Sequence, residues 1–284
     1  MRRWPLIAIP RMKGELISRN RIRLAGGVSL WWVAGIAVVF MASPLLYGFS
    51  RVQGAALSSN LAVFGQFMGS PIQLVFPLLA AGLGCTTLFQ ELSARFVVNL
   101  RTRIAMTDYL RIRLIQSAAI PFFVVATSVL LVFAVCFIYW PAIGNPSIDI
   151  SVFVWTPEER AASDGNMFGF SELIDLSPWA YGIWIAVWTG LCAAAYSAAT
   201  AACLLVVERK AVAILIPGGI FLVETIVAAL AGNPYAGLLY SAFPFSLQQQ
   251  DAFTTAAPTL VLVSVIVLSW VRILRNPYRL RALL

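Results

Sequence analysis

The chain has 284 residues, of which 60% are hydrophobic and only 11% are charged. Water-soluble domains carry about 25% charged residues, so this composition excludes a soluble globular protein and predicts an integral membrane protein. The absence of histidine removes the commonest general base and metal ligand. All four cysteines (Cys85, Cys136, Cys192 and Cys203) lie inside apolar runs, which favours small buried side chains over disulfide or metal roles.

Six apolar runs are long enough to be transmembrane helices, since a helix needs about 20 such residues to cross a bilayer. They predict an all-α fold with spans at approximately 27–48, 70–90, 115–140, 178–207, 211–231 and 254–274. The fourth span opens with Ser177 as the helix cap and Pro178 in the first turn, which is a common helix start. We therefore divide the chain into an amphipathic segment at 1–26 and a transmembrane domain at 27–284.

The positive charges predict how this domain is oriented. Residues 1–26, the loop after the second span, the loop after the fourth span and the C-terminal tail together hold eighteen Lys and Arg, and the opposite side holds two. The positive-inside rule then places both termini in the cytoplasm. The net charge of +8 is explained by this bias, so nucleic-acid binding is not expected. The excess of Arg over Lys suggests a GC-rich bacterium and hence its inner membrane.

Two outer segments differ in composition. The loop at 142–178 holds six acidic residues and one arginine, which indicates a small solvated cap. The segment at 232–253 has no charge before Asp251 and is interrupted by Pro234 and Pro244. It could re-enter the outer leaflet as short helices, provided that protein satisfies its backbone, or it could be an ordinary apolar loop.

The cytoplasmic stretch at 89–114, FQELSARFVVNLRTRIAMTDYLRIRL, is longer than a connector requires. Helical spacing places Phe89, Leu92, Phe96 and Leu100 on one apolar face. The pattern predicts a helix projecting from the second span, a turn near 102–107, and a return helix capped by Thr107 or Asp108 that continues into the third span. An interfacial helix lying on anionic lipid is the alternative.

A second basic amphipathic stretch, RMKGELISRNRIRL at 11–24, precedes the first span. An interfacial elbow helix, six spans, a helical excursion between spans two and three, and a short inner loop between spans four and five together resemble the membrane subunit of ABC type-2 transporters. Phe89 and Glu91 fit the start of that family's excursion, and Arg101-Thr102-Arg103 with Tyr109-Leu110 resemble its later turn and return helix. Ser93-Ala94-Arg95-Phe96 stands where the family often carries a Gly-Thr-Leu-Glu-like run.

The resemblance implies a permease subunit that exports an amphipathic or apolar substrate by alternating access and is not itself an enzyme. The excursion would be a coupling helix that docks into a separate cytoplasmic ATPase subunit. The contacts expected from this resemblance are Phe89, Glu91, Arg95, Phe96 and Arg101, with Glu208 and Arg209 as a second contact. Because the sequence lacks GxxxxGK[ST], ATP and Mg²⁺ would be bound by the partner, with no cofactor in this chain. Six spans are half of the family's usual twelve, which implies a second permease copy or a paralogue, surrounded by membrane lipid.

Glu224 is the one carboxylate well inside an apolar run, and such a residue is a functional candidate by default. Pro217 and Gly218 precede it and permit a kink, so the three residues could line a translocation path. Two other functions stay open: an ion-coupled secondary transporter that uses Glu224 as its proton site, and a non-transporting membrane scaffold. Small residues at 190–203 favour close helix packing, more within the subunit than in a dimer.

Overall fold

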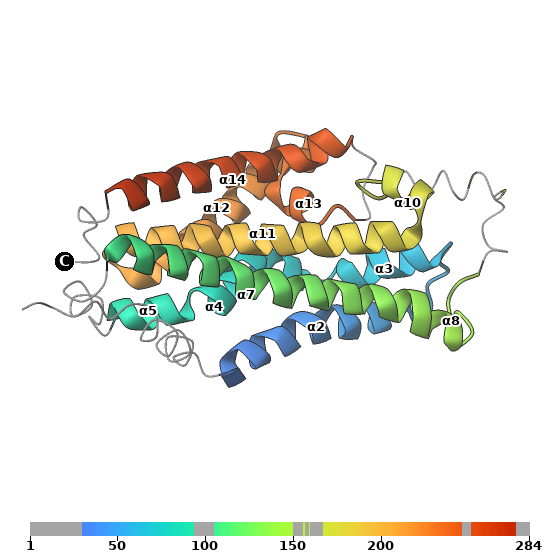
Figure 1. Cartoon of the computed structure of the whole chain (residues 1–284). Helices are drawn as coiled ribbons and strands as arrows, with labels where there is room; N and C mark the ends of the chain where they lie inside the picture. Colours follow the sequence, from blue (N-terminus) through green and yellow to red (C-terminus); the bar gives the residue numbers. More distant parts are fainter. Residues whose placement is uncertain are drawn as a thin grey trace, which may run out of the picture.

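The computed structural model describes residues 30–93, 105–149, 156, 159, 167–245 and 251–276, and these form an elongated bundle of helices (Figure 1). The long helices are α2 (Leu30–Val52), α7 (Met106–Ala134), α11 (Pro178–Val206), α12 (Lys210–Leu230) and α14 (Ala252–Arg275). Five helices are long and apolar enough to cross a membrane, and one bent pair of shorter helices would make a sixth. The chain is therefore an all-helical, multi-pass membrane protein.

Shorter elements connect the long helices. They are α3 (Asn60–Met68), η1 (Pro71–Val75), α4 (Phe76–Gly84), α5 (Thr86–Ser93), the π-helical turn η2 (Val135–Tyr139), α8 (Trp140–Ala142), α10 (Glu172–Leu176), η4 (Pro234–Ala236) and α13 (Leu238–Ala242). Figure 1 shows α5 at one end of the bundle and α10 at the other, and these names are used below for the two ends.

Helix α11 lies at the centre of the bundle. It packs along α7, and α4, α12 and α14 also contact it. The small residues at 190–203 permit the close contact between α11 and α7. A Cβ at Gly190 would lie 3.0 Å from the Phe122 carbonyl oxygen and from the Ala126 Cβ of α7. The stretch thus packs within the chain, as predicted, and it brings two helix backbones close together. At the start of α11, Ser177 Oγ accepts the Trp179 N–H at 3.2 Å, which is the predicted cap.

The second predicted span, at 70–90, is wrong as a single helix. The helical segment begins ten residues earlier, at Asn60, and Ser59 caps it by accepting the Ala62 N–H at 3.2 Å. The pair α3 and η1–α4 is bent by 46° around Gly69 and Ser70. Pro71 explains the bend, because proline disfavours helical geometry in the preceding residue and Ser70 is extended there. A further break at Cys85 separates α4 from α5.

The return helix at the third span is present, since helical structure runs from Met106 to Ala142 over 37 residues. It is capped differently from the prediction. Ala105 occupies the N-cap position without a side-chain hydrogen bond, so neither Thr107 nor Asp108 is the cap. Asp108 instead lies in the first turn, where a carboxylate interacts favourably with the helix dipole.

The remaining long helices, α2, α11, α12 and α14, end within a few residues of the boundaries expected from sequence. The elbow segment at 1–26 lies outside the described residues. The segment after α12 forms η4 and α13, and α13 contacts α11, α12 and α14. Figure 1 shows α13 beside the long helices, inside their ends. Leu238, Ser241 and Ala242 of α13 are buried, so this part of the segment is not an exposed loop.

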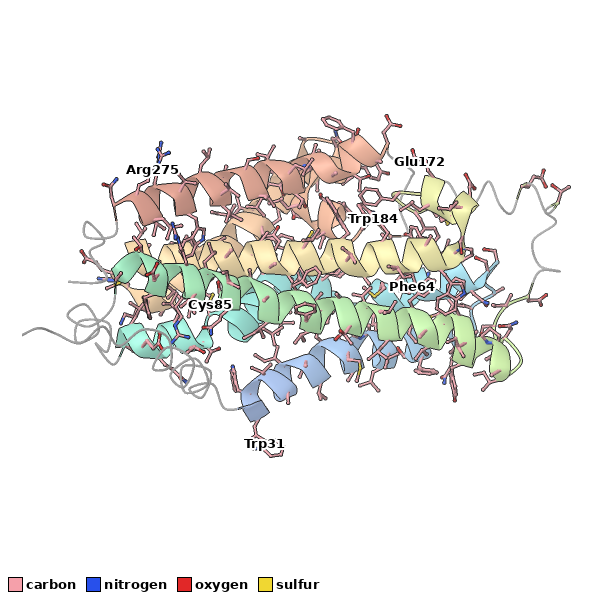
Figure 2. All side chains as sticks on the ribbon, viewed as in Figure 1. Trp31, Phe64, Cys85, Glu172, Trp184 and Arg275 are labelled. Carbon is pink, nitrogen blue, oxygen red and sulfur yellow. The ribbon has the colours of Figure 1, made fainter. Side chains whose placement is uncertain are left out.

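Two groups of buried side chains hold the bundle together. The aromatic cluster reaches from mid-bundle to the α10 end and includes Phe40, Phe64, Phe67, Phe76 and Phe133. The α5-end cluster joins α5, the start of α7 and the adjoining ends of α11 and α14, and it is built mainly from Leu, Ala and Ile. In Figure 2, Phe64 and Cys85 mark these two clusters, and Arg275 and Glu172 lie at opposite ends of the bundle.

Candidate functional site

The α5 end contains a buried polar contact between α5 and α7. An ion pair joins Glu91 of α5 to Arg113 of α7, whose guanidinium also donates to Gln116 Oε1 at 2.6 Å. The Tyr109 hydroxyl donates to the other Glu91 oxygen at 2.6 Å. The Arg113 guanidinium lies 5.6 Å from the centre of the Tyr109 ring. Glu91, Tyr109 and Arg113, referred to below as the α5–α7 clamp, therefore fix the two helices that flank residues 94–104.

The clamp is buried inside the chain. The Arg113 side chain is 4% exposed and that of Glu91 is 14% exposed. Both Glu91 oxygens are hydrogen-bonded within the chain, so the structure shows an intramolecular role for this residue, which is among the ATPase-coupling residues expected from sequence. Sequence reasoning also missed Arg113. The available signal was that Tyr109 and Arg113 stand four residues apart, on one face of the return helix.

The other predicted coupling residues fall into three groups. Phe89 is half-buried and packs against the α5-end cluster, and Leu92 is buried in it, so this apolar face turns into the chain. Glu208 and Arg209 are exposed in the short connection from α11 to α12, at the same end of the bundle. Arg95, Phe96 and Arg101 lie outside the described residues. The structure thus brings α5 and the 208–209 turn to one face of the molecule.

Glu224 lies on α12 and contacts α13. Its Oε2 accepts the Leu238 N–H at 2.7 Å, at the first residue of α13. Pro217 and Gly218 are buried two turns earlier, and α12 continues through both as one helix. A Cβ at Gly218 would lie 3.1 Å from the Leu78 side chain of α4. Of the three path candidates, Gly218 therefore packs closely against α4, Pro217 lines a hollow described below, and Glu224 holds the start of α13.

Uncharged polar groups hold α13 from its other side. Trp188 Nε1 of α11 donates to the Ser241 carbonyl oxygen at 2.7 Å. Ser241 Oγ donates to the Thr255 carbonyl oxygen of α14 at 2.5 Å and lies 2.8 Å from Thr259 Oγ1. All four residues are buried. Helix α13 is thus hydrogen-bonded to three long helices, α11, α12 and α14.

Two adjoining hollows lie beside α11 and α14, and α12 lines the smaller of them. One has a volume of about 160 Å³ and the other of about 700 Å³, and they share Ala202, Cys203 and Ser269. The larger hollow lies toward the α5 end, where Arg272 and Asn276 line it. The smaller one ends against Tyr196 and Leu238. Together they form a mostly apolar cleft, called the α11–α12–α14 cleft below, which leads from the α5 end toward α13.

Comparison with models of protein families gives no match, and neither the curated proteins nor the solved structures give one. Over the described parts of the chain, no three His, Cys, Asp or Glu side chains are grouped so that they could hold a metal ion.

Proposed function

We propose that this chain is the permease subunit of an ATP-driven transporter of the ABC type-2 class, which exports an amphipathic or apolar substrate by alternating access. It acts with separate cytoplasmic ATPase subunits, which bind ATP and Mg²⁺, and with a second permease copy or paralogue. The proposal places it in a bacterial inner membrane with both termini in the cytoplasm.

The observation that carries this proposal is the α5–α7 clamp. A segment that transmits force from a partner needs a rigid connection to the membrane helices. Glu91, Tyr109 and Arg113 provide it, because their buried bonds join the two helices at the base of residues 94–104. A docking helix with apolar anchors and charges suits this position, and Arg95, Phe96 and Arg101 supply those residue types.

The distribution of charge supports the orientation. Arg111, Arg209, Arg272 and Arg275 are exposed at the α5 end. Near the α10 end, Glu172, Asp175 and Asp251 are exposed. Since cytoplasmic loops carry the excess of Lys and Arg, the α5 end is assigned to the cytoplasm. An ATPase would then meet the bundle where α5 and the 208–209 turn lie together.

The test is purification of the tagged chain from native membranes, followed by an ATPase assay of the eluate. We expect a co-purifying ATPase with the wild type, and its loss in the double variant Arg95→Ala/Phe96→Ala. The matched control is Arg51→Ala/Phe253→Ala, which removes the same residue types near the opposite end and should keep the ATPase. A wild-type eluate without ATPase activity would refute the proposed function, and retention by the 95/96 variant would refute the docking site.

A further inference from the structure

Glu224 lies on α12 just beyond the residues of that helix that line the α11–α12–α14 cleft. Ile216, Pro217 and Ile220 line the cleft, and they precede Glu224 by eight, seven and four residues. These spacings place Glu224 on the same helix face, one turn beyond the last lining residue. Leu238, which also lines the cleft, donates its N–H to Glu224 Oε2. The carboxylate therefore lies next to the cleft, at its α13 side.

The charge of Glu224 has no compensating cation in the part of the chain that the structure describes. Among those residues the ion pair is Glu91–Arg113, at the other end of the bundle. The hydrogen bond from Leu238 engages one oxygen and leaves Oε1 without a donor there. A charged side chain within a membrane helix is costly unless it is paired, so the site favours a ligand that brings a positive charge.

A second polar group lies at the same place. Tyr196 lines the cleft and is 2% exposed, and its hydroxyl makes no hydrogen bond with any described residue. Tyr196 lines the smaller hollow together with Leu238, whose N–H donates to Glu224. Its ring contacts the buried Phe221 ring of α12, with centroids 5.5 Å apart. A buried tyrosine hydroxyl usually has a partner, and here a ligand could supply it.

From these observations we propose that the α11–α12–α14 cleft binds an amphipathic organic cation. Its ammonium group lies at Glu224 and near Tyr196, and its apolar body lies along Ile220, Leu262 and Val265. The smaller hollow, about 160 Å³, holds only part of such a molecule. It adjoins the hollow of about 700 Å³, which is of the size that holds drug-sized ligands. The inference rests on the proposed function, for which it names the substrate class.

The test is equilibrium binding of rhodamine 6G, a lipophilic fluorescent cation, to the purified full chain in nanodiscs of zwitterionic lipid. Fluorescence anisotropy reports Kd without ATP or an ATPase. We expect saturable binding to the wild type. Glu224→Gln should raise Kd by about tenfold or more, because it removes one ion pair, and a tenfold change in Kd corresponds to about 1.4 kcal/mol. Glutamine keeps an oxygen for the Leu238 N–H, so the cap on α13 is preserved. Glu172→Gln, which removes an exposed charge near the α10 end, should leave Kd unchanged.

A second pair of variants tests the cleft without changing charge. Val265→Trp fills the lining, and Val261→Trp places the same side chain one turn away, at an exposed position outside the lining. Only the first should weaken binding. Absence of saturable binding, or an unchanged Kd in either Glu224→Gln or Val265→Trp, would overturn the inference. Since no ATPase is present, that result would leave the co-purification test to decide the proposed function separately.

Discussion

The two ends of the bundle are stabilised by different kinds of contact. In the aromatic cluster, Phe64 meets Phe133 and Phe245 edge to face, with ring centroids 5.3 and 5.4 Å apart. The α5-end cluster shows no such ring pair among the described residues, and its distinctive contact is the buried Glu91–Arg113 pair. The aromatic cluster is therefore stabilised by complementary shape and dispersion. The α5 end is stabilised by close packing of small residues and by one charge pair.

This difference bears on how each end could move. Edge-to-face rings contribute many small contacts that are shared among several residues, so no single contact decides whether this end holds together. A buried ion pair depends on two specific groups and becomes strongly unfavourable if one is left alone. The α5 end thus has a discrete connection, located where the proposed coupling segment begins and ends. The following variants test this contrast, from the largest expected effect to the smallest.

Removing one partner of the clamp should have the largest effect. Arg113→Ala leaves the Glu91 carboxylate buried without its cation, and breaking such a pair costs about 3–5 kcal/mol of unfolding free energy. Unfolding in mixed detergent and SDS micelles measures it. The control is Arg111→Ala on the same helix, at an exposed position, which should change the free energy of unfolding by less than about 0.5 kcal/mol.

The double variant Glu91→Met/Arg113→Met distinguishes the charge from the packing. Apolar side chains of similar length often replace a buried pair at little cost, so it should be more stable than Arg113→Ala. It should nevertheless reduce co-purification of the ATPase if the charge pair fixes the geometry of residues 94–104. Equal loss of stability in the double and single variants would show that the pair acts through packing alone.

At the aromatic cluster, Phe133→Ala should lower the free energy of unfolding by about 3 kcal/mol. This is the lower end of the range for such cavities, because the hydrophobic effect does not drive helix packing in lipid. Phe133 is fully buried, and it contacts Phe64, Phe137 and Trp179. The same micelle unfolding experiment measures the cost. Phe123→Ala, on the same helix but 65% exposed, is the control and should be close to wild type. Similar losses in both variants would contradict a packed aromatic cluster.

Gly84→Ala tests the close packing on which the α5 end depends. A Cβ there would lie 2.2 Å from the Ser117 carbonyl oxygen of α7 and 2.1 Å from Ser197 Oγ of α11, so backbone must shift. Such overpacking costs about 1–3 kcal/mol. Gly35→Ala on α2, where nothing lies within 4 Å, should instead be neutral or slightly stabilising. Thermal unfolding of the two variants in detergent compares them directly, and a stable Gly84→Ala would refute this close approach.

Sequence patterns predicted the long helices well because the bilayer imposes their length and composition. The start of α11 was predictable from Ser177 and Pro178, which act locally. Helix α3 was missed because its nine residues are too few to cross a bilayer. The break at Gly69–Pro71 also interrupts the sequence pattern, so its continuation into α4 was not recognised. The clamp was missed for another reason. Glu91 and Arg113 are 22 residues apart, so their pairing depends on how α5 and α7 pack, which no local pattern encodes.

The smallest effect is expected at the contact between α13 and α14, which links the aromatic cluster to the cleft. Ser241→Ala removes one buried hydroxyl that bonds the Thr255 carbonyl oxygen and Thr259, and hydrogen bonds of this kind contribute about 1 kcal/mol net. Ser264→Ala is the control, since its hydroxyl bonds only the Leu260 carbonyl of its own helix and is exposed. Hydrogen exchange of residues 238–242 should rise in the first variant and stay unchanged in the second.

If global stability fell by several kcal/mol instead, α13 would be part of the cooperative core and not a separately held element. If exchange did not rise, the contacts from Glu224 and Trp188 would suffice to hold α13 in place.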